Sequence, residues 1–205
     1  MCGFIGIYSS KDSYSQNIYK MNEELNHRGP DAEGYFFSKN KKLCIGHKRL
    51  SIIGLDHTGN QPFVSECNNF VLAYNGEIYN FLDIKSELNK NYKINWKSKT
   101  DTEVLFYSLQ LLGYPKTLKI LRGMFTFIFY NQRKNEILVG RDQFGQKPLY
   151  YGISDNNLYI ASELKPIIND NKVKKEISEK SVNLFLKLNY IPSPYSIYQN
   201  FFKLK

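Results

Sequence analysis

The sequence lacks the features of several large protein classes. It contains no apolar run of transmembrane length, no G-x-G-x-x-G loop or Walker A run that would bind phosphate groups, and no serine nucleophile elbow. No grouping of histidine and cysteine has the spacing of a metal site. We therefore expect no membrane partner, no metal and no cofactor bound by this chain.

Runs of basic residues are also absent, although basic residues are in excess. The chain has 28 Lys+Arg against 19 Asp+Glu, a formal net charge of +9, yet no five consecutive positions are basic. The lysines are dispersed, and asparagine is abundant as well, which indicates compositional bias rather than a binding patch. Nucleic acid is therefore not an expected partner.

Cysteine is scarce, and its count is odd. Cys2, Cys44 and Cys67 are widely spaced, and the sequence shows no signal peptide. Such usage is typical of a reducing, cytoplasmic setting. The 205 residues, of which 42% are hydrophobic and 15% aromatic, suit one α/β or α+β domain with a sizeable core.

The hydrophobic periodicity predicts clusters of strands separated by helices. Expected strands are residues 4–8, 33–38, 43–47, 50–53, 70–74, 78–79, 124–130, 136–140, 148–151 and 158–161. Expected helices are residues 16–26, 81–88, 101–112, 115–121 and 178–188. Because strands and helices do not alternate one by one, the order favours an α+β fold of largely antiparallel sheets covered by helices.

Local signals mark the turns and helix starts. Asn75-Gly76 between apolar runs predicts a hairpin turn, and Gly29-Pro30 predicts a turn at residues 27–31. Glycine and proline also mark residues 56–62 as a loop. Asn80 is expected to cap the helix that follows it. Thr100 and Glu103 have the spacing of a capping box.

Cys2 is the first candidate for chemistry. Removal of Met1 would leave Cys2 with a thiol of pKa about 8.5 and a free α-amine of pKa about 7.7–8.0. One residue would then supply both a nucleophile and its base, directly or through a water. The apolar segment that follows Cys2 predicts a buried strand, so Cys2 could equally be a small buried hydrophobe at the start of that strand.

Asn75 and Gly76 are candidates for an oxyanion hole. An asparagine side-chain N–H and a glycine backbone N–H can point to one spot, where they stabilise the negative oxygen of a tetrahedral intermediate. The same dipeptide is also the most common sequence of an ordinary two-residue hairpin turn. The dipeptide alone does not decide between these two interpretations.

Charged residues in apolar or turn contexts form a third group of candidates. Arg49 could clamp a carboxylate with two parallel hydrogen bonds, or could be a solvated cation at a strand edge. Asp101 could hold an ammonium group together with Glu77, or could simply favour the start of its helix. The three histidines, His27, His47 and His57, are expected to be structural.

Taken together, these segments resemble a known family. The matching pieces, in chain order, are Met1-Cys2-Gly3, HRGPD at 27–31, RLSI at 49–52, QP at 61–62, NGEIYN at 75–80, TDTE at 100–103, GMF at 123–125, GRDQFG at 140–145, KPLYY at 147–151 and SELK at 162–165. The chain resembles the class II, N-terminal-nucleophile glutamine amidotransferase domain of glutamine-hydrolysing asparagine synthetases. Each piece is weak alone, but ten in order cover nearly the whole chain.

The resemblance implies a four-layer α/β/β/α sandwich and a role for each matching residue. Cys2 would attack the side-chain amide of L-glutamine, and Asn75 with Gly76 would form the oxyanion hole. Glutamine would be bound by Arg49 at its α-carboxylate, by Glu77 and Asp101 at its α-ammonium, and by the main chain of the pocket-lining residues Leu50, Ser51, Ile52 and Ile53. The segments at 27–31 and 141–145 are assigned to the scaffold near the site.

The resemblance also implies a division of the chain. Residues 2–189 would form the amidotransferase domain, and residues 190–205 the start of a linker to a synthetase domain that this sequence does not contain. ATP and Mg would belong to that absent domain, where the ammonia would amidate aspartate. Related enzymes amidate other carboxylates, in surface-sugar or peptide pathways. A catalytically silent binding module that keeps the fold is the third interpretation, and a homodimer is left open.

Overall fold

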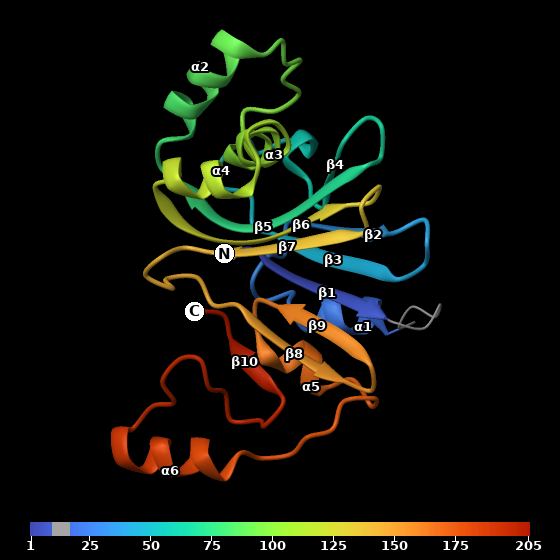
Figure 1. Cartoon of the computed structure of the whole chain (residues 1–205). Helices are drawn as coiled ribbons and strands as arrows, with labels where there is room; N and C mark the ends of the chain where they lie inside the picture. Colours follow the sequence, from blue (N-terminus) through green and yellow to red (C-terminus); the bar gives the residue numbers. More distant parts are fainter. Residues whose placement is uncertain (10–16) are drawn as a thin grey trace.

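Two antiparallel sheets form the centre of the molecule (Figure 1). The computed structural model describes residues 1–9 and 17–205. The first sheet has the order β10-β8-β9-β1-β3-β2, with β10 at Phe201–Lys203, β8 at Tyr150–Ser154, β9 at Asn157–Ala161, β1 at Gly3–Ser9, β3 at Leu43–Arg49 and β2 at Ala32–Phe37. The second has the order β4-β5-β6-β7, with β4 at Phe63–Val64, β5 at Phe70–Ile78, β6 at Gly123–Asn131 and β7 at Glu136–Arg141.

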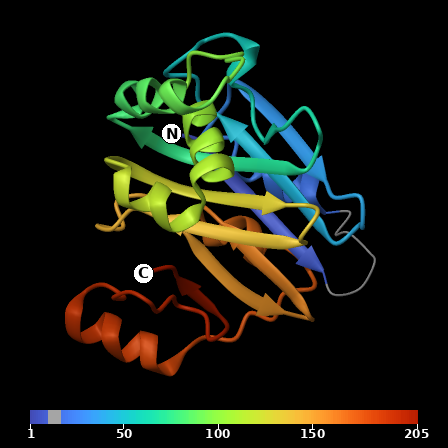
Figure 2. The same ribbon diagram turned by 45° about the horizontal axis from the view of Figure 1, so that its top comes forward.

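Helices cover the outer faces of both sheets (Figures 1 and 2). The helices are α1 at Ile18–Glu23, α2 at Phe81–Asn91, α3 at Asp101–Leu112, α4 at Tyr114–Ile120, α5 at Leu164–Ile168 and α6 at Glu179–Leu188. The green α2, α3 and α4 cover the second sheet, whereas α1 and α5 contact the first. Helix α6 projects below the sandwich and buries only Ser181.

Three hydrophobic cores show how the layers stack. One core joins α2 and α3 to the second sheet, and includes Leu72 and Phe106. Another fills the space between the sheets, and includes Phe4 and Val71. The last joins the first sheet to α1 and α5. Three buried interfaces require four layers, so the predicted α+β sandwich of helix, sheet, sheet and helix is confirmed.

The predicted hairpin turn at Asn75-Gly76 is wrong. Strand β5 runs without interruption from Phe70 to Ile78 and pairs along its whole length with β6. A Cβ added at Gly76 would lie 2.2 Å from the carbonyl oxygen of Met124 on β6. Glycine is therefore needed here for close approach of two strands rather than for a turn, a distinction that a local dipeptide signal cannot make.

The predicted strand at residues 50–53 is also wrong. Strand β3 ends at Arg49, which pairs with Ala32, the first residue of β2. The other neighbour of β3 begins at Gly3, which pairs with Lys48. Beyond Arg49 neither side offers a strand to complete the backbone hydrogen bonds, so an apolar segment of high β propensity stays irregular.

Helix boundaries agree with the sequence better than the caps do. The expected helix at 16–26 appears as α1, although its predicted first residue lies outside the described residues. Ser178 caps α6 as its side chain accepts a hydrogen bond from the Ser181 N–H. Thr100 occupies the N-cap of α3 but forms no capping box, because the Glu103 carboxylate accepts from backbone N–H groups of the preceding loop.

The predicted cap at Asn80 is not formed. Asn80 stands at the N-cap of α2, but its side chain bonds the backbone of Ile120 and Arg122 instead of the helix.

Other short elements were outside the sequence prediction. The expected loop at 56–62 contains a 3-10 helix at His57–Gly59. Strands β4 and β10 and helix α5 were not predicted. Strand β10, within the expected linker at 190–205, pairs with β8 at the edge of the first sheet.

Candidate active site at the amino terminus

Strand periodicity brings three predicted residues to one end of the space between the sheets. On β1, Phe4 faces this space, so Cys2, two residues earlier, faces it too. On β3, the inward-facing series through Leu43 and Ile45 ends at Arg49. On β5, Val71 and Ala73 start the series that continues with Asn75.

A cavity opens at this end of the sandwich. Nearly all of the predicted site residues line it: Cys2, Arg49, Leu50, Ile52, Ile53, Asn75, Gly76, Glu77 and Asp101. Ser51 is not among its lining residues. The backbone N–H of Ser51 donates to the carboxylate of Asp31 at 2.8 Å. Within the described part of the chain, no group of three or more His, Cys, Asp or Glu could hold a metal ion.

The Cys2 thiol is half-buried and has polar neighbours. Its Sγ lies 3.4 Å from the Leu50 N–H, which donates to it, and 3.6 Å from the Leu50 carbonyl oxygen. Burial raises the pKa of the thiol, although the Leu50 N–H and the charge of Arg49 act in the opposite direction. The thiol therefore rests in its neutral form and requires a base to become a nucleophile.

Asn75 carries an unused donor. The residue is only 1% exposed, and its Nδ2 has no hydrogen-bond partner among the described residues. Leaving a buried donor unpaired costs about 1–3 kcal/mol, so such groups are rare outside functional sites. This orphaned N–H in the wall of the cavity is a ready site for a ligand oxygen.

Gly76 directs its backbone N–H to the cavity side of β5. The N–H groups of Tyr74 and Ile78, two residues before and two residues after Gly76, point away from β6. They donate to Gln61 Oε1 at 2.7 Å and to Asp101 Oδ2 at 3.0 Å. In an antiparallel ladder every second N–H faces the same way, so the Gly76 N–H faces this side as well. It thus stands beside the Asn75 side chain in the same cavity wall.

Asp101 and Glu77 make one end of the cavity negative. Asp101 is 5% exposed, and its Oδ2 also accepts from the Tyr74 hydroxyl at 2.7 Å. Burial raises the pKa of Asp101, the hydrogen bonds from Tyr74 and Ile78 lower it, and the charge of Glu77 raises it further. A buried carboxylate and a half-buried one in the same cavity lining favour a cationic ligand group.

Arg49 lies beside the cavity and is held by the loop that follows β3. Its Nη1 donates to the Asp56 carbonyl at 2.7 Å and to Asn60 Oδ1 at 2.9 Å, while its Nη2 donates to the Gly54 carbonyl. A Cβ at Gly59 would lie 2.3 Å from Nη2, so only glycine leaves room for the guanidinium. A two-bond clamp on a carboxylate therefore requires the loop acceptors to move.

The turn at 27–31, assigned to the scaffold from the sequence, fixes the amino terminus directly. Arg28 Nε donates to the Cys2 carbonyl oxygen at 2.9 Å, and its Nη1 pairs with Glu163 at 2.6 Å. A Cβ at Gly29 would lie 2.5 Å from the Lys48 carbonyl, so the turn packs tightly on β3. The only sequence signal for this role was the rigid Gly-Pro pair after a charged residue.

Further lining residues had no site role in the sequence analysis, among them Tyr74 and Gln61. The Gln61 side chain accepts from the Tyr74 N–H, and the Tyr74 hydroxyl donates to Asp101, but nothing in the local sequence distinguishes the two residues from core residues.

His47 lies outside the cavity, and its Nε2 donates to the Tyr74 carbonyl at 3.0 Å. Complete burial lowers the pKa of His47 to about 4, so the ring is neutral at physiological pH.

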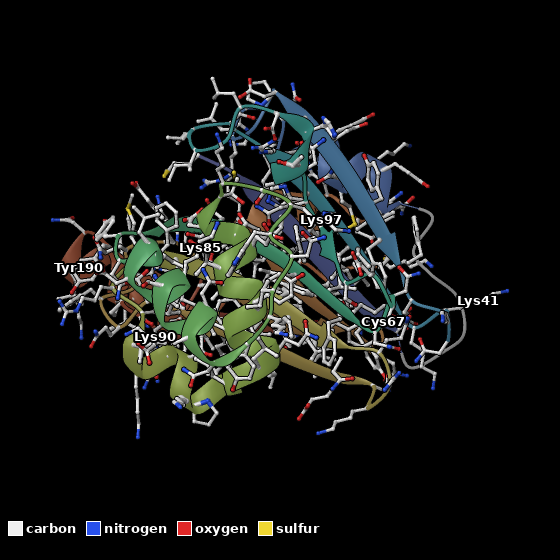
Figure 3. All side chains as sticks on the ribbon, turned by 90° about the horizontal axis from the view of Figure 1, so that it is seen from above. Lys41, Cys67, Lys85, Lys90, Lys97 and Tyr190 are labelled. Carbon is white, nitrogen blue, oxygen red and sulfur yellow. The ribbon has the colours of Figure 1, made fainter. Side chains whose placement is uncertain are left out.

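Charged side chains are spread over the surface. Of the labelled lysines, Lys41 lies between β2 and β3, Lys85 and Lys90 both lie on α2, and Lys97 lies in the loop before α3 (Figure 3). Cys67 is exposed in the loop between β4 and β5, away from the cavity. Among the described residues, no helix has the length and apolar character needed to cross a membrane.

Curated relatives match this chain over most of its length. A Methanocaldococcus jannaschii protein that bears the name of a glutamine-hydrolysing asparagine synthetase is 38% identical over 100% of this chain and 42% of its own length. For asparagine synthetase 1 of Bacillus subtilis the identity is 35%, over 95% of this chain and 30% of the relative. The Escherichia coli asparagine synthetase B is 35% identical over 82% of this chain and 30% of its own length.

The chain therefore spans less than half the length of these relatives. A solved structure of glutamine phosphoribosylpyrophosphate amidotransferase from B. subtilis superposes with a TM-score of 0.69 at 24% identity, and covers 82% of this chain and 43% of that one. This likeness shows the fold alone, which the chain shares with that amidotransferase. The sequence profile described as a glutamine amidotransferase domain matches residues 1–205. With profile, relatives and fold in agreement, this chain belongs to the family of glutamine amidotransferase domains.

Proposed function

We propose that the chain hydrolyses L-glutamine to glutamate and ammonia through a thioester on Cys2. The observation that carries this proposal is the buried, unpartnered Nδ2 of Asn75, which lines the same cavity as the Cys2 thiol. A donor beside a nucleophilic thiol is what an oxyanion needs, because the negative oxygen that forms on attack accepts hydrogen bonds more strongly than the ground-state amide oxygen. The family and the names of the relatives support the choice of glutamine.

The reaction follows from the groups in the cavity. After removal of Met1, the Cys2 amine takes the thiol proton, directly or through a water, and the thiolate bonds to the amide carbon of glutamine. The amide oxygen becomes an oxyanion that accepts hydrogen bonds from Asn75 Nδ2 and the Gly76 N–H. The carbon–nitrogen bond then breaks, and the amine returns its proton to the departing ammonia. Water hydrolyses the thioester, which releases glutamate and restores the thiol.

The α-carboxylate and α-ammonium of glutamine share one carbon atom, and the cavity lining offers charges of both signs for them. Arg49 offers a guanidinium for the α-carboxylate, and the main chain of residues 50–53 lines the space beside it. Glu77 and Asp101 offer carboxylates for the α-ammonium. Asp101 is held by two hydrogen bonds and so presents its charge in a fixed position.

The acceptor of the ammonia is proposed from the relatives, which are named glutamine-hydrolysing asparagine synthetases and are more than twice as long as the matched segment. We infer that a cytoplasmic full-length enzyme carries a synthetase domain that uses ATP and Mg to amidate aspartate. Amidation of another carboxylate by a related enzyme is the alternative. Supplying the full-length enzyme with aspartate or other carboxylates, and measuring amide formation, separates the two.

The glutaminase proposal is tested by incubating the purified chain with L-glutamine and measuring glutamate and ammonia. Intact mass establishes whether Met1 has been removed. The Cys2→Ala variant should reduce glutamate formation to background, while Cys67→Ser, at an exposed cysteine outside the cavity, should leave it unchanged. Glutamate formation by Cys2→Ala at the wild-type rate would exclude the thioester mechanism.

A silent binding module is the second candidate, because Met1 itself lines the cavity in this structure. A chain that keeps Met1 has an amide in place of the Cys2 amine, and so lacks the base. Calorimetric titration with L-glutamine, together with intact mass, distinguishes the two functions. Binding without turnover by a chain that retains Met1 supports the module, and turnover by the processed chain excludes it.

A further inference from the structure

The loop between β7 and β8 is built to fix the backbone of Lys147. Arg141 Nε donates to the Lys147 carbonyl oxygen at 2.7 Å. The Asp142 carboxylate accepts from the N–H groups of Gln146 at 2.9 Å and Lys147 at 3.1 Å. Asp142 is also joined to β6 by hydrogen bonds with Phe125, the residue opposite Gly76. The segment assigned to the scaffold therefore places Lys147 at a defined position beside the cavity.

The Lys147 side chain is buried and poorly partnered. The residue is 4% exposed, and its Nζ contacts the thioether sulfur of Met1 at 2.8 Å. A thioether is a weak acceptor, and an ammonium has three donors. Within the described ranges, no carboxylate lies at salt-bridge distance from this Nζ. Burying an ammonium without a counter-ion costs free energy of folding. Such a lysine beside the amino terminus therefore indicates a functional role.

Several charges surround the amino terminus. The charged and titratable groups that face it or its neighbours are the Cys2 thiol, Arg28 and Asp31 of the turn after α1, Arg49 on β3, Glu77 on β5, Asp101 on α3, Asp142 and Lys147 of the loop after β7, and Glu163, which pairs with Arg28. Burial lowers the pKa of the Met1 amine most, Arg28 and Lys147 lower it further, and the Cys2 thiol and Asp31 raise it. The two cations thus disfavour the protonated form of the Met1 amine, and Cys2, the next residue, lines the same cavity as Lys147.

We propose that Lys147 is a positioning residue whose fixed positive charge keeps the α-amine of processed Cys2 uncharged, so that this amine can accept the thiol proton. The proposal rests on the proposed glutaminase function and adds a control of its base. In the unprocessed chain the Met1 thioether contacts the ammonium. Removal of Met1 releases Lys147 to act on the new terminus, where Arg28 already holds the Cys2 carbonyl. A neighbouring cation disfavours protonation of an amine because two like charges repel each other.

The first experiment measures kcat/KM for glutamine against pH, because this profile reports the free enzyme's acid and base. Lys147→Met and Lys147→Gln remove the charge, and Lys147→Arg keeps it. Without the charge, the acidic limb of the profile should move up by about one pH unit, which is about a tenfold loss on that limb and none on the alkaline side. Lys147→Arg should keep the wild-type profile.

Lys48→Met is the matched control. Lys48 is also a buried lysine, but its side chain pairs with Glu33 and points to the outer face of the first sheet. Its profile should not move. An equal loss of activity at every pH in both uncharged Lys147 variants would show a purely structural role and overturn the proposal, as would an acidic limb that stays in place.

The second experiment measures the amine without any turnover. In a Cys2→Ser background, which removes the competing thiol, competitive labelling with acetic anhydride at a series of pH values gives the pKa of the terminal amine by peptide mapping. Adding Lys147→Met should raise that pKa by about one unit. An unchanged pKa refutes the proposal even if the chain proves to be a glutaminase. A raised pKa with no glutaminase activity in the wild type would instead refute the proposed function alone.

Discussion

The two walls of the cavity differ in how they hold their functional groups. The β5 wall is part of a continuous sheet, and it carries the unpaired donor of Asn75, the N–H of Gly76 and the amide that orients Asp101. The opposite wall is the irregular loop after β3, which wraps Arg49 with backbone oxygens. Rigid elements hold catalytic groups more precisely than loops do. We expect the sheet wall to serve the chemical step through Asn75 and Gly76 as well as binding of the ammonium, and the loop wall to serve binding alone.

The largest expected effect tests the sheet wall. Asn75→Ala removes one donor to the oxyanion and should lower kcat by about 10²–10³-fold, with little change in KM. The isosteric Asn75→Asp variant keeps the shape but replaces the donor with an acceptor that can carry a negative charge, so it should be impaired at least as strongly. Steady-state kinetics with L-glutamine measure both variants, and urea unfolding checks the fold. If KM rises and kcat does not fall, the division between the walls is wrong.

Asp101 should have the next largest effect. Asp101→Asn keeps an oxygen acceptor for the Tyr74 hydroxyl and the Ile78 N–H but removes the charge that would hold the substrate ammonium. Loss of a charged hydrogen bond corresponds to about 2 kcal/mol, so KM should rise about 30-fold. The measurement is KM for L-glutamine at neutral pH, and Tyr74→Phe, which leaves the carboxylate charged, is its control. A KM near the wild-type value would remove Asp101 from the ammonium site.

A smaller effect is expected from the loop wall. In Gly59→Ala the new Cβ would lie 2.3 Å from Arg49 Nη2, so the guanidinium would have to move. Because the loop can adjust, KM should rise about tenfold, or about 1.4 kcal/mol, with kcat largely kept. Gly113→Ala is a matched control, as a Cβ there meets nothing within 4 Å, although its positive φ adds local strain. A fall in kcat alone for Gly59→Ala would show that the loop wall also takes part in the chemistry.

The last prediction concerns stability rather than activity, through a hydrogen bond between β3 and β5. His47 on β3 donates to the Tyr74 carbonyl on β5, and burial lowers its pKa from the usual 6.5 to about 4. Since the unfolded chain binds the proton first, the neutral ring stabilises the fold fully above pH 6.5, and this stability is lost as the pH falls toward 4. The loss should reach about 3 kcal/mol in urea unfolding and should largely disappear in His47→Gln.

The sequence predicted which residues line the cavity better than it predicted the local structure around it. Cys2, Arg49 and Asp101 stood out as candidates because they are charged or nucleophilic residues in apolar or turn contexts, and the family resemblance gave each a proposed role. Arg28 and Lys147 did not stand out, because their roles depend on contacts with residues 26 and 146 positions away in the chain. Residues 75–76 and 50–53 were assigned the wrong structure because the presence or absence of a neighbouring strand outweighed local propensity.

By itself, the sequence determined the fold class and the chemistry available to it. Strand and helix periodicity predicted antiparallel sheets covered by helices, and motifs named the reactive groups, because both depend on residue type and short spacing. Only the tertiary structure decided where those groups meet. Pairing between distant strands aligned the inward faces of β1, β3 and β5, left the Asn75 amide without a partner, and set a buried lysine beside the amino terminus.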